Sequence, residues 1–127
     1  MTALDHMTLR VRDLSKSIGF YMNIVGLIYI CRVGLFELIK VNPRLTIALL
    51  QEDPKDQVHL AFSFDSASFH ALHARLVSQK VPFGGEVSVR DGRISENAFG
   101  ARGMAKALYF YDPNMRNLEA RLYVAET

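Results

Sequence analysis

Two histidines and one glutamate, widely separated along the chain, are the residues whose types and spacing suggest chemistry. His6 and His59 each open an extended segment, and Glu119 lies in a late one. The gaps between them are 53 and 60 residues, so each step is about half of the chain. Two imidazoles and one carboxylate form the ligand set of a mononuclear divalent metal site with open positions. The even spacing suggests two copies of one module, with the metal site where they meet.

The bulk composition is that of one globular domain. The chain has 127 residues, of which 50% are hydrophobic and 22% charged, and a formal net charge of +2. Its basic residues are scattered rather than grouped with aromatic ones, so we expect no nucleic-acid binding. No apolar run approaches the length of a membrane span, so we expect no membrane partner. The single cysteine, Cys31, and the lack of a signal-peptide pattern favour a cytoplasmic location.

The first half of the chain, 1–54, has the pattern of a β-α-β-β-β module. Alternation over 5–13 predicts a strand with His6, Thr8 and Arg10 on one face. Asp13 is a suitable N-cap for a helix that ends near Gly26. Three apolar stretches separated by turn residues then predict strands at 28–33, 35–41 and 45–51.

The second half, 55–127, repeats this order. We expect a strand at 58–64, a helix capped by Asp65 or Ser66 and ending near Gln79, and strands at 86–90, 107–111 and 117–124. The stretch 91–106 is polar and rich in glycine, which predicts a loop. Its length is typical of a lid over a site, although a plain solvated connection is an equal alternative.

Superposing the halves by the 53-residue offset places His6 on His59 and helix on helix. The first-half counterpart of Glu119 is then Ile47 or Ala48, with an uncertainty of one residue. Neither side chain is a metal ligand. The repeat therefore provides two histidines but only one carboxylate.

Several short motifs, taken in order, resemble those of the vicinal oxygen chelate superfamily, which includes glyoxalase I, fosfomycin-resistance proteins, extradiol dioxygenases and bleomycin-resistance proteins. The resemblance covers nearly the whole chain. The motifs are Asp5-His6-x-Thr8-x-x-Val11-x-Asp13-Leu14, Ser17-x-x-Phe20-Tyr21-x-x-x-x-Gly26-Leu27, His59-Leu60-Ala61-Phe62, and Tyr109-Phe110-Tyr111-Asp112-Pro113 ahead of Glu119.

This resemblance implies an α+β fold of two βαβββ modules whose mixed sheets curl into a cup around one metal ion. It also implies a homodimer with sites shared between chains. By position, His6, His59 and Glu119 are the metal ligands, and the ion is iron, manganese, zinc, nickel or cobalt. Strand alternation places small or polar residues beside these ligands, among them Ser63 and Arg121.

The chain departs from the family pattern in two places. The turn before Glu119 usually reads Asp-Pro-Asp-Gly-Asn, and here it reads Asp112-Pro113-Asn114-Met115-Arg116. Such turns often need a positive φ, which glycine adopts more readily than other residues. The second carboxylate that glyoxalase I uses as a ligand and base is also missing, which disfavours the standard glyoxalase I reaction.

The resemblance therefore implies a metal-dependent enzyme acting on a small, oxygen-rich, anionic substrate. Candidate catalytic residues are Tyr109 and Glu37, the latter being a general base in one branch of the family or simply an exposed strand residue. Candidate substrate-binding residues, which include cations for an anionic group, are Thr8, Arg10, Ser63 and Arg121.

Three more specific functions stay open at this point. A fosfomycin-resistance enzyme would open an epoxide, and Thr8 and Tyr109 occupy positions that suit it. An extradiol dioxygenase would need a further histidine in the cup, whereas His70 and His73 fall on the second predicted helix. A bleomycin-resistance-like protein would sequester a ligand without a metal and would lack the His-His-Glu set.

Overall fold

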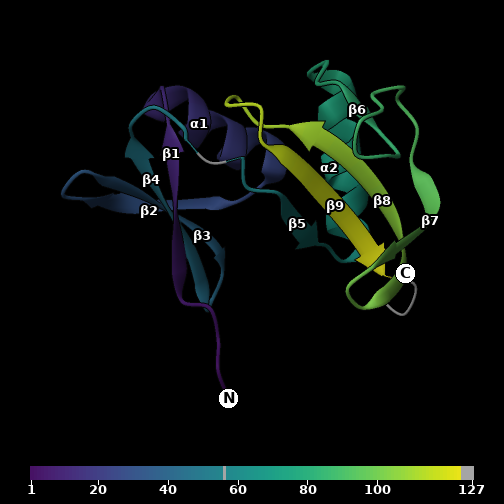
Figure 1. The fold of residues 1–127 in the computed structure, drawn as a ribbon, viewed down its shortest axis with the longest axis horizontal. Coiled ribbons are helices and arrows are strands. Elements are labelled where there is room, and N and C mark those ends of the chain that lie inside the picture. The colour runs from purple at the N-terminus through teal and green to yellow at the C-terminus, as the bar shows by residue number, and fades with distance from the viewer. Residues whose placement is uncertain (56, 124–127) are drawn as a thin grey trace. The chain divides into compact units, whose positions relative to one another are not determined.

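The computed structural model describes residues 1–55 and 57–123 and divides into two compact units, Met1–Gln57 and Val58–Thr127 (Figure 1). Each unit contains one mixed sheet and its helical segment, and each is described by itself. Over the described residues, no helix has the length and apolar character needed to cross a membrane.

The first unit has the predicted β-α-β-β-β order. Its strands form one sheet in the order β1-β4-β3-β2, in which β1 and β4 are parallel and the other neighbours are antiparallel. The elements are β1 (His6–Val11), α1 (Leu14–Phe20), η1 (Tyr21–Val25), β2 (Ile28–Val33), β3 (Phe36–Asn42) and β4 (Leu45–Gln51).

The helical segment of this unit begins and ends where the sequence predicts. The Asp13 carboxylate accepts the backbone N–H of Lys16 at 3.0 Å, which caps an otherwise unpaired donor of the first turn. Gly26 ends the segment in the left-handed region, at φ 88°. The sequence did not predict that the second part, η1, winds as a π-helix with Tyr21 completely buried.

Strand alternation gives the first sheet two different faces. One face buries an apolar set, each member at most 1% exposed: Leu9, Val11, Ile39, Ile47 and Leu49. Burying each such side chain stabilises the fold by about 1.5–3 kcal/mol relative to leaving it in water. His6 and Thr8 alternate with these residues along β1 and therefore lie on the other face.

The second unit builds its sheet in the order β5-β9-β8-β6, with β7 also paired to β8. The parallel pair is β5–β9, as β1–β4 is in the first unit. Asp65 caps α2 by accepting the N–H of Ser68 at 2.8 Å, and α2 buries Phe69, Leu72 and Leu76. The elements are β5 (Leu60–Ser63), α2 (Ser66–Ser78), β6 (Phe83–Gly84), β7 (Ser95–Gly100), β8 (Gly103–Tyr111) and β9 (Asn117–Tyr123).

Two predictions for this unit are wrong. The stretch 91–106, predicted as a loop, contains β7 and the start of β8, which form an antiparallel hairpin. The short strand predicted at 86–90 is instead β6, at Phe83–Gly84. β6 and β7 pair with successive parts of β8, so together they take the place that β2 alone takes in the first sheet. A polar edge hairpin carries no clear apolar alternation, so periodicity did not reveal it.

The turn before Glu119 keeps its geometry without glycine. Met115 occupies the expected glycine position with φ 63°, which costs a side-chain-bearing residue on the order of 1 kcal/mol. The Asp112 carboxylate compensates, since it accepts the N–H groups of Asn114 at 2.8 Å and Arg116 at 2.9 Å. It also pairs with the Arg116 guanidinium at 3.2 Å, and both side chains are buried.

We expect Gly84→Ala to destabilise the second unit strongly. A Cβ at Gly84 would lie 1.9 Å from the carbonyl oxygen of Val89, and a backbone atom has little freedom to move away. We expect the free energy of unfolding in urea to fall by about 2–4 kcal/mol. The matched control is Gly19→Ala in α1, where the nearest atom is 3.9 Å away and alanine favours the helix. Equal unfolding midpoints for the two variants would contradict this account.

Candidate metal centre

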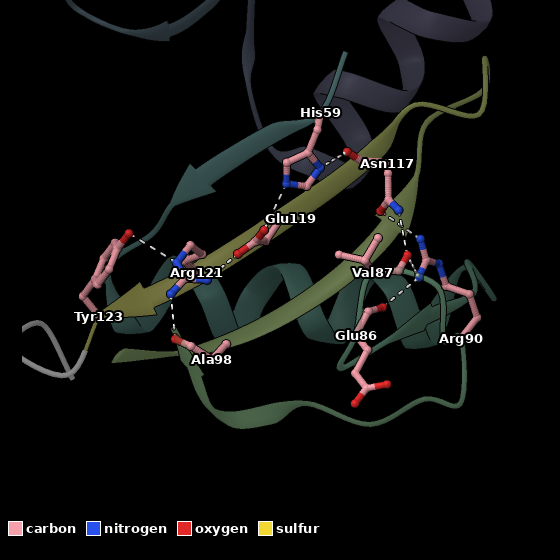
Figure 2. A network of polar contacts seen from close by, with 9 residues as sticks. All are labelled: His59, Glu86, Val87, Arg90, Ala98, Asn117, Glu119, Arg121 and Tyr123. Carbon is pink, nitrogen blue, oxygen red and sulfur yellow. Dashed lines mark hydrogen bonds and ion pairs between the residues drawn. The ribbon is translucent and has the colours of Figure 1, made fainter. Parts of the chain in front are cut away.

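His59 and Glu119 come together in the second unit through the parallel pairing of β5 and β9. Ala61 lies opposite Glu119, and the residue two places earlier, His59, reaches Asn117 at the start of β9. Its Nδ1 lies 2.7 Å from the Asn117 carbonyl oxygen, and its Nε2 lies 3.1 Å from Glu119 Oε1 (Figure 2). The Glu119 side chain is 8% exposed and that of His59 46% exposed. The pair is therefore anchored on the inside and open on the imidazole side.

The proton positions in this pair follow from its acceptors. A carbonyl oxygen only accepts hydrogen bonds, so Nδ1 of His59 carries a hydrogen and donates it to Asn117. Nε2 then faces a carboxylate oxygen, which is also an acceptor. Two acceptors at this separation need either a proton, on the ring or on the carboxyl group, or a bound metal ion. A ligand histidine that donates its other N–H to a backbone carbonyl is typical of metal sites.

The second oxygen of Glu119 has a different partner. Arg121, two residues later on β9, donates from Nη1 to Glu119 Oε2. Arg121 also donates from Nε to the Tyr123 hydroxyl at 3.2 Å. Sequence reasoning predicted that Arg121 binds substrate, and the structure shows a guanidinium that is 4% exposed and already paired with the candidate ligand.

Tyr109 lies directly across the sheet from Glu119. Tyr109 on β8 pairs with Glu119 on the neighbouring strand β9. The Tyr109 ring is stacked against the His59 ring, with centroids 6.4 Å apart. Burial, followed by the negative charge of Glu119 and a hydrogen bond to it, raises the pKa of the Tyr109 phenol. Tyr109 therefore keeps its proton at neutral pH and serves as a hydrogen-bond donor beside the pair.

Ser63 lines a cavity together with Glu119 and Arg121. Ser63 pairs with Arg121 across β5 and β9. A cavity of about 370 Å³ is lined by Ala61, Ser63, Phe99, Gly100, Ala101, Arg102, Glu119, Arg121 and Tyr123. Two of the predicted substrate-binding residues thus lie with one candidate ligand in this unit.

His6 lies on β1 of the first unit and has its own acceptor. Its Nδ1 is 2.8 Å from the Asp5 carboxylate, which leaves Nε2 as the nitrogen suited to a metal. The side chain is 64% exposed. It borders a cavity of about 330 Å³ whose lining is Asp5, His6, Thr8, Val33, Phe36, Leu38, Thr46 and Ala48. Thr8, the third residue of the strand, is therefore beside His6 as predicted from alternation.

The register of the first sheet resolves which residue corresponds to Glu119. Thr8 pairs with Ala48 in the first unit as Ala61 pairs with Glu119 in the second. The counterpart is therefore Ala48 rather than Ile47. Its methyl group lines the cavity beside His6, so the first unit supplies no carboxylate at this position.

Arg10 and Glu37 have partners elsewhere in the first unit. Arg10 shares the strand face of His6, and its Nε lies 3.2 Å from the Glu52 carboxylate. Glu37 is 9% exposed and accepts from the Tyr29 hydroxyl at 3.2 and 3.3 Å. On β3 it alternates with Phe36 and Leu38, which border the His6 cavity, so it lies on the opposite face of the strand.

The two remaining histidines belong to α2. His70 Nδ1 lies 2.7 Å from the Ser66 carbonyl oxygen one turn earlier, and the His73 ring packs edge-on against Phe83. Both have helix and core partners in the second unit. This placement confirms the prediction that both histidines lie on the second helix.

Two groups that help to position His59 and β9 were not predicted from the sequence. The Asn117 carbonyl holds His59, and a backbone atom has no signature in residue type. Arg90 donates from Nη2 to the Asn117 side chain at 2.9 Å and from Nη1 to the carbonyl oxygens of Glu86, at 3.1 Å, and Val87, at 3.0 Å (Figure 2). It thereby fastens the 86–90 turn to β9. For His6, in contrast, the sequence does show a candidate hydrogen-bond partner, because Asp5 directly precedes it.

Within each unit, the described residues contain no cluster of three or more His, Cys, Asp or Glu side chains suited to a metal ion. The second unit provides His59 and Glu119, and the first provides His6.

We expect the tyrosines of the second unit to ionise in a defined order. Burial tends to raise the pKa of the Tyr123 phenol, but hydrogen bonds from Arg121 and from the Arg102 backbone outweigh it, so its pKa is lowered. The pKa of Tyr109 is raised. In an ultraviolet titration, Tyr123→Phe should remove the earliest tyrosinate step and Tyr109→Phe a late one. The reverse assignment would contradict the described contacts.

The raised pKa of Tyr109 also makes the free energy of unfolding depend on pH in the alkaline range. Below about pH 10 the phenol is protonated in both the folded and the unfolded chain, so its favourable burial is fully present. As the pH rises through the folded-state pKa, that contribution is lost. The alkaline fall in stability should therefore be smaller in Tyr109→Phe than in the parent protein, as measured by urea unfolding.

Comparison with known proteins agrees with this fold. "Metallothiol transferase FosB" of Lysinibacillus sphaericus (strain C3-41) is 26% identical over 123 residues, covering 92% of this chain and 79% of that protein. The structure of "Oxidase ChaP-H2" matches with a TM-score of 0.83 and 24% identity, over 96% of this chain and 94% of that one. Lactoylglutathione lyase from Agrobacterium tumefaciens matches with a TM-score of 0.66 and 18% identity, over 96% and 94%.

At these identities, the structural matches are evidence of the shared fold alone. The family assignment comes from the sequence match to the model of the Glyoxalase/Bleomycin resistance protein/Dioxygenase superfamily, which spans residues 3–116. Since that span covers well over half of the chain, the chain belongs to the Glyoxalase/Bleomycin resistance protein/Dioxygenase superfamily.

Proposed function

We propose that this protein is an enzyme that binds one divalent metal ion through His6, His59 and Glu119 and acts on a small, oxygen-rich, anionic substrate. The observation that carries the proposal is the His59–Glu119 pair. Nε2 and Oε1 face each other at 3.1 Å, while the Asn117 carbonyl takes the proton of the other ring nitrogen. This arrangement presents two negative or lone-pair-bearing atoms to one cation.

His6 also suits a metal ligand, because its Nδ1, like that of His59, lies beside a hydrogen-bond acceptor. An acceptor holds Nδ1 in both histidines, Asp5 in one and Asn117 in the other, and this fixes the tautomer that presents Nε2. With Ala48 at the position that corresponds to Glu119, the protein offers three ligands rather than four. Three protein ligands leave coordination positions for substrate oxygens.

A divalent ion in such a site would act as a Lewis acid, stabilising negative charge on substrate oxygens. The surrounding side chains would then orient the substrate. Tyr109 keeps its phenolic proton and is placed to donate a hydrogen bond beside His59. Ser63 and Thr8 provide hydroxyl groups to the cavities of the second and first units.

A second candidate function is addition of a thiol to an epoxide of the fosfomycin type. It is favoured by the 26% identity to a protein named metallothiol transferase. The thiolate sulfur would attack an epoxide carbon as the C–O bond opens, and the resulting alkoxide would take up a proton. A catechol-cleaving dioxygenase is less supported, because His70 and His73 have their contacts on the α2 side. Metal-free ligand sequestration is the remaining alternative.

The first test is metal content per chain after purification without chelators or an affinity tag. We expect about one divalent ion per chain in the parent protein and none in His59→Ala, with an unchanged far-ultraviolet circular dichroism spectrum. The control is His70→Ala, which removes an exposed histidine that bonds within α2. It should retain the metal. A His59→Ala protein that still binds one ion per chain would refute the ligand assignment.

The identity of the metal then selects the substrate screen. Iron would direct the work to a catechol panel with oxygen uptake. Zinc, manganese, nickel or cobalt would direct it to fosfomycin with a thiol, monitored by mass spectrometry. A protein that binds no metal, even on titration, would overturn the enzyme proposal in favour of ligand sequestration.

We also propose that the protein is a homodimer whose metal sites combine residues of both chains. The test is a heterodimer of His6→Ala and His59→Ala chains, purified through two different tags removed before measurement. If sites are shared, one of its two sites has all three ligands and the other lacks both histidines. We then expect one metal ion per heterodimer and none in either homodimer. If each chain builds its own site, the heterodimer binds none.

A further inference from the structure

Arg121 connects the candidate metal ligand Glu119 to the hairpin formed by β7 and β8. Its guanidinium donates from Nη1 to Glu119 Oε2 and from Nη2 to the carbonyl oxygens of Ala98, at 2.8 Å, and Gly103, at 3.3 Å. Figure 2 shows the Arg121 side chain pointing from β9 toward Glu119 and Ala98. A cation that is 4% exposed thus holds a carboxylate on one side and the hairpin backbone on the other.

The hairpin is shaped to receive this guanidinium. A Cβ at Gly100 would lie 2.3 Å from both Cζ and Nη2 of Arg121, and 2.7 Å from its Nε. Only a residue without a side chain leaves that space. The close approach, rather than a left-handed backbone, accounts for glycine here, since the hairpin turn takes its positive φ at Gly103 instead.

The contacts give the two oxygens of Glu119 different nitrogen partners. Oε2 is paired with Arg121, and Oε1 faces His59 Nε2 at 3.1 Å. We propose that Arg121 is a positioning residue that restricts Glu119 to offering a single oxygen to a divalent cation, and that the β7–β8 hairpin holds it in this position. The inference rests on the proposed metal site and describes how that site is tuned.

The positive charge of Arg121 determines whether this contact strengthens or weakens metal binding. A guanidinium paired with a ligand carboxylate neutralises part of the charge that attracts the metal ion. It also prevents bidentate ligation by that carboxylate, a mode that carboxylates otherwise use freely. Arg121 therefore makes the metal bind more weakly and leaves one more coordination position for substrate. A residue that only held Glu119 in place for the metal ion would instead make the metal bind more tightly.

The test is cobalt binding to the metal-free protein at about pH 8, where carboxylates are ionised, read by affinity and by the visible spectrum. We expect Arg121→Met to bind Co²⁺ roughly tenfold more tightly, which is the usual size of effects from residues that contact metal ligands. The spectrum should change, because a second Glu119 oxygen joins the ion. Added Co²⁺ should also raise the melting temperature more in Arg121→Met than in the parent protein.

A second variant keeps the charge and changes only its place. Gly100→Ala should push the guanidinium, the end of a flexible side chain, away from its partners. We expect tighter Co²⁺ binding with the same spectral change but a smaller gain, because the positive charge stays nearby. This variant decides the matter if Arg121→Met does not fold. The control is Lys106→Met, which removes a cation of β8 that pairs with Glu96 at 3.8 Å and lies on the strand face opposite that of Arg121, so it should alter affinity by less than about twofold.

The outcomes separate this inference from the proposed function. A parent protein that takes up no Co²⁺ would overturn both. A parent protein that binds Co²⁺, together with Arg121→Met and Gly100→Ala variants of equal or weaker affinity and unchanged spectrum, would overturn only the role of Arg121. Tighter binding in both folded variants, with Lys106→Met unchanged, would support it.

Discussion

The parallel pairing of the first and last strands in each unit is the constraint on which the candidate site depends. In the second unit it sets Ala61 opposite Glu119 and so brings His59 to the Asn117 carbonyl and to Glu119 Oε1. Side chains alternate between the two faces of a strand, so a slip of one residue would turn Glu119 to the other face. Every contact described for this pair therefore requires that register.

The same framework carries different chemistry in the two units. At the positions of Glu119 and Arg121 the first unit has Ala48 and Leu50, as the pairing with Thr8 and Arg10 shows. The first unit therefore presents a histidine on an open, largely apolar face. The second buries an ion pair instead. Desolvating such a pair costs about as much as the pairing returns, so the Arg121–Glu119 pair adds little net stability.

Local signals predicted the elements well where a single residue controls the backbone. The N-cap at Asp13 and the helix end at Gly26 are both present in the structure. The β7–β8 hairpin was missed because a polar edge strand has no apolar periodicity. Residue type also did not show that the Glu37 carboxylate is buried against Tyr29.

By itself, the sequence determined the order of elements in the first unit, the repeat, the family pattern and the types of the three candidate ligands, because these depend on residue identity and spacing along the chain. Only the tertiary structure decided that Ala48 corresponds to Glu119, that the Asn117 carbonyl holds His59, and that Arg121 takes one oxygen of Glu119. The first two depend on the register between strands up to about half the chain apart, which no single residue encodes. The third depends on the β7–β8 hairpin, whose carbonyl oxygens hold Arg121.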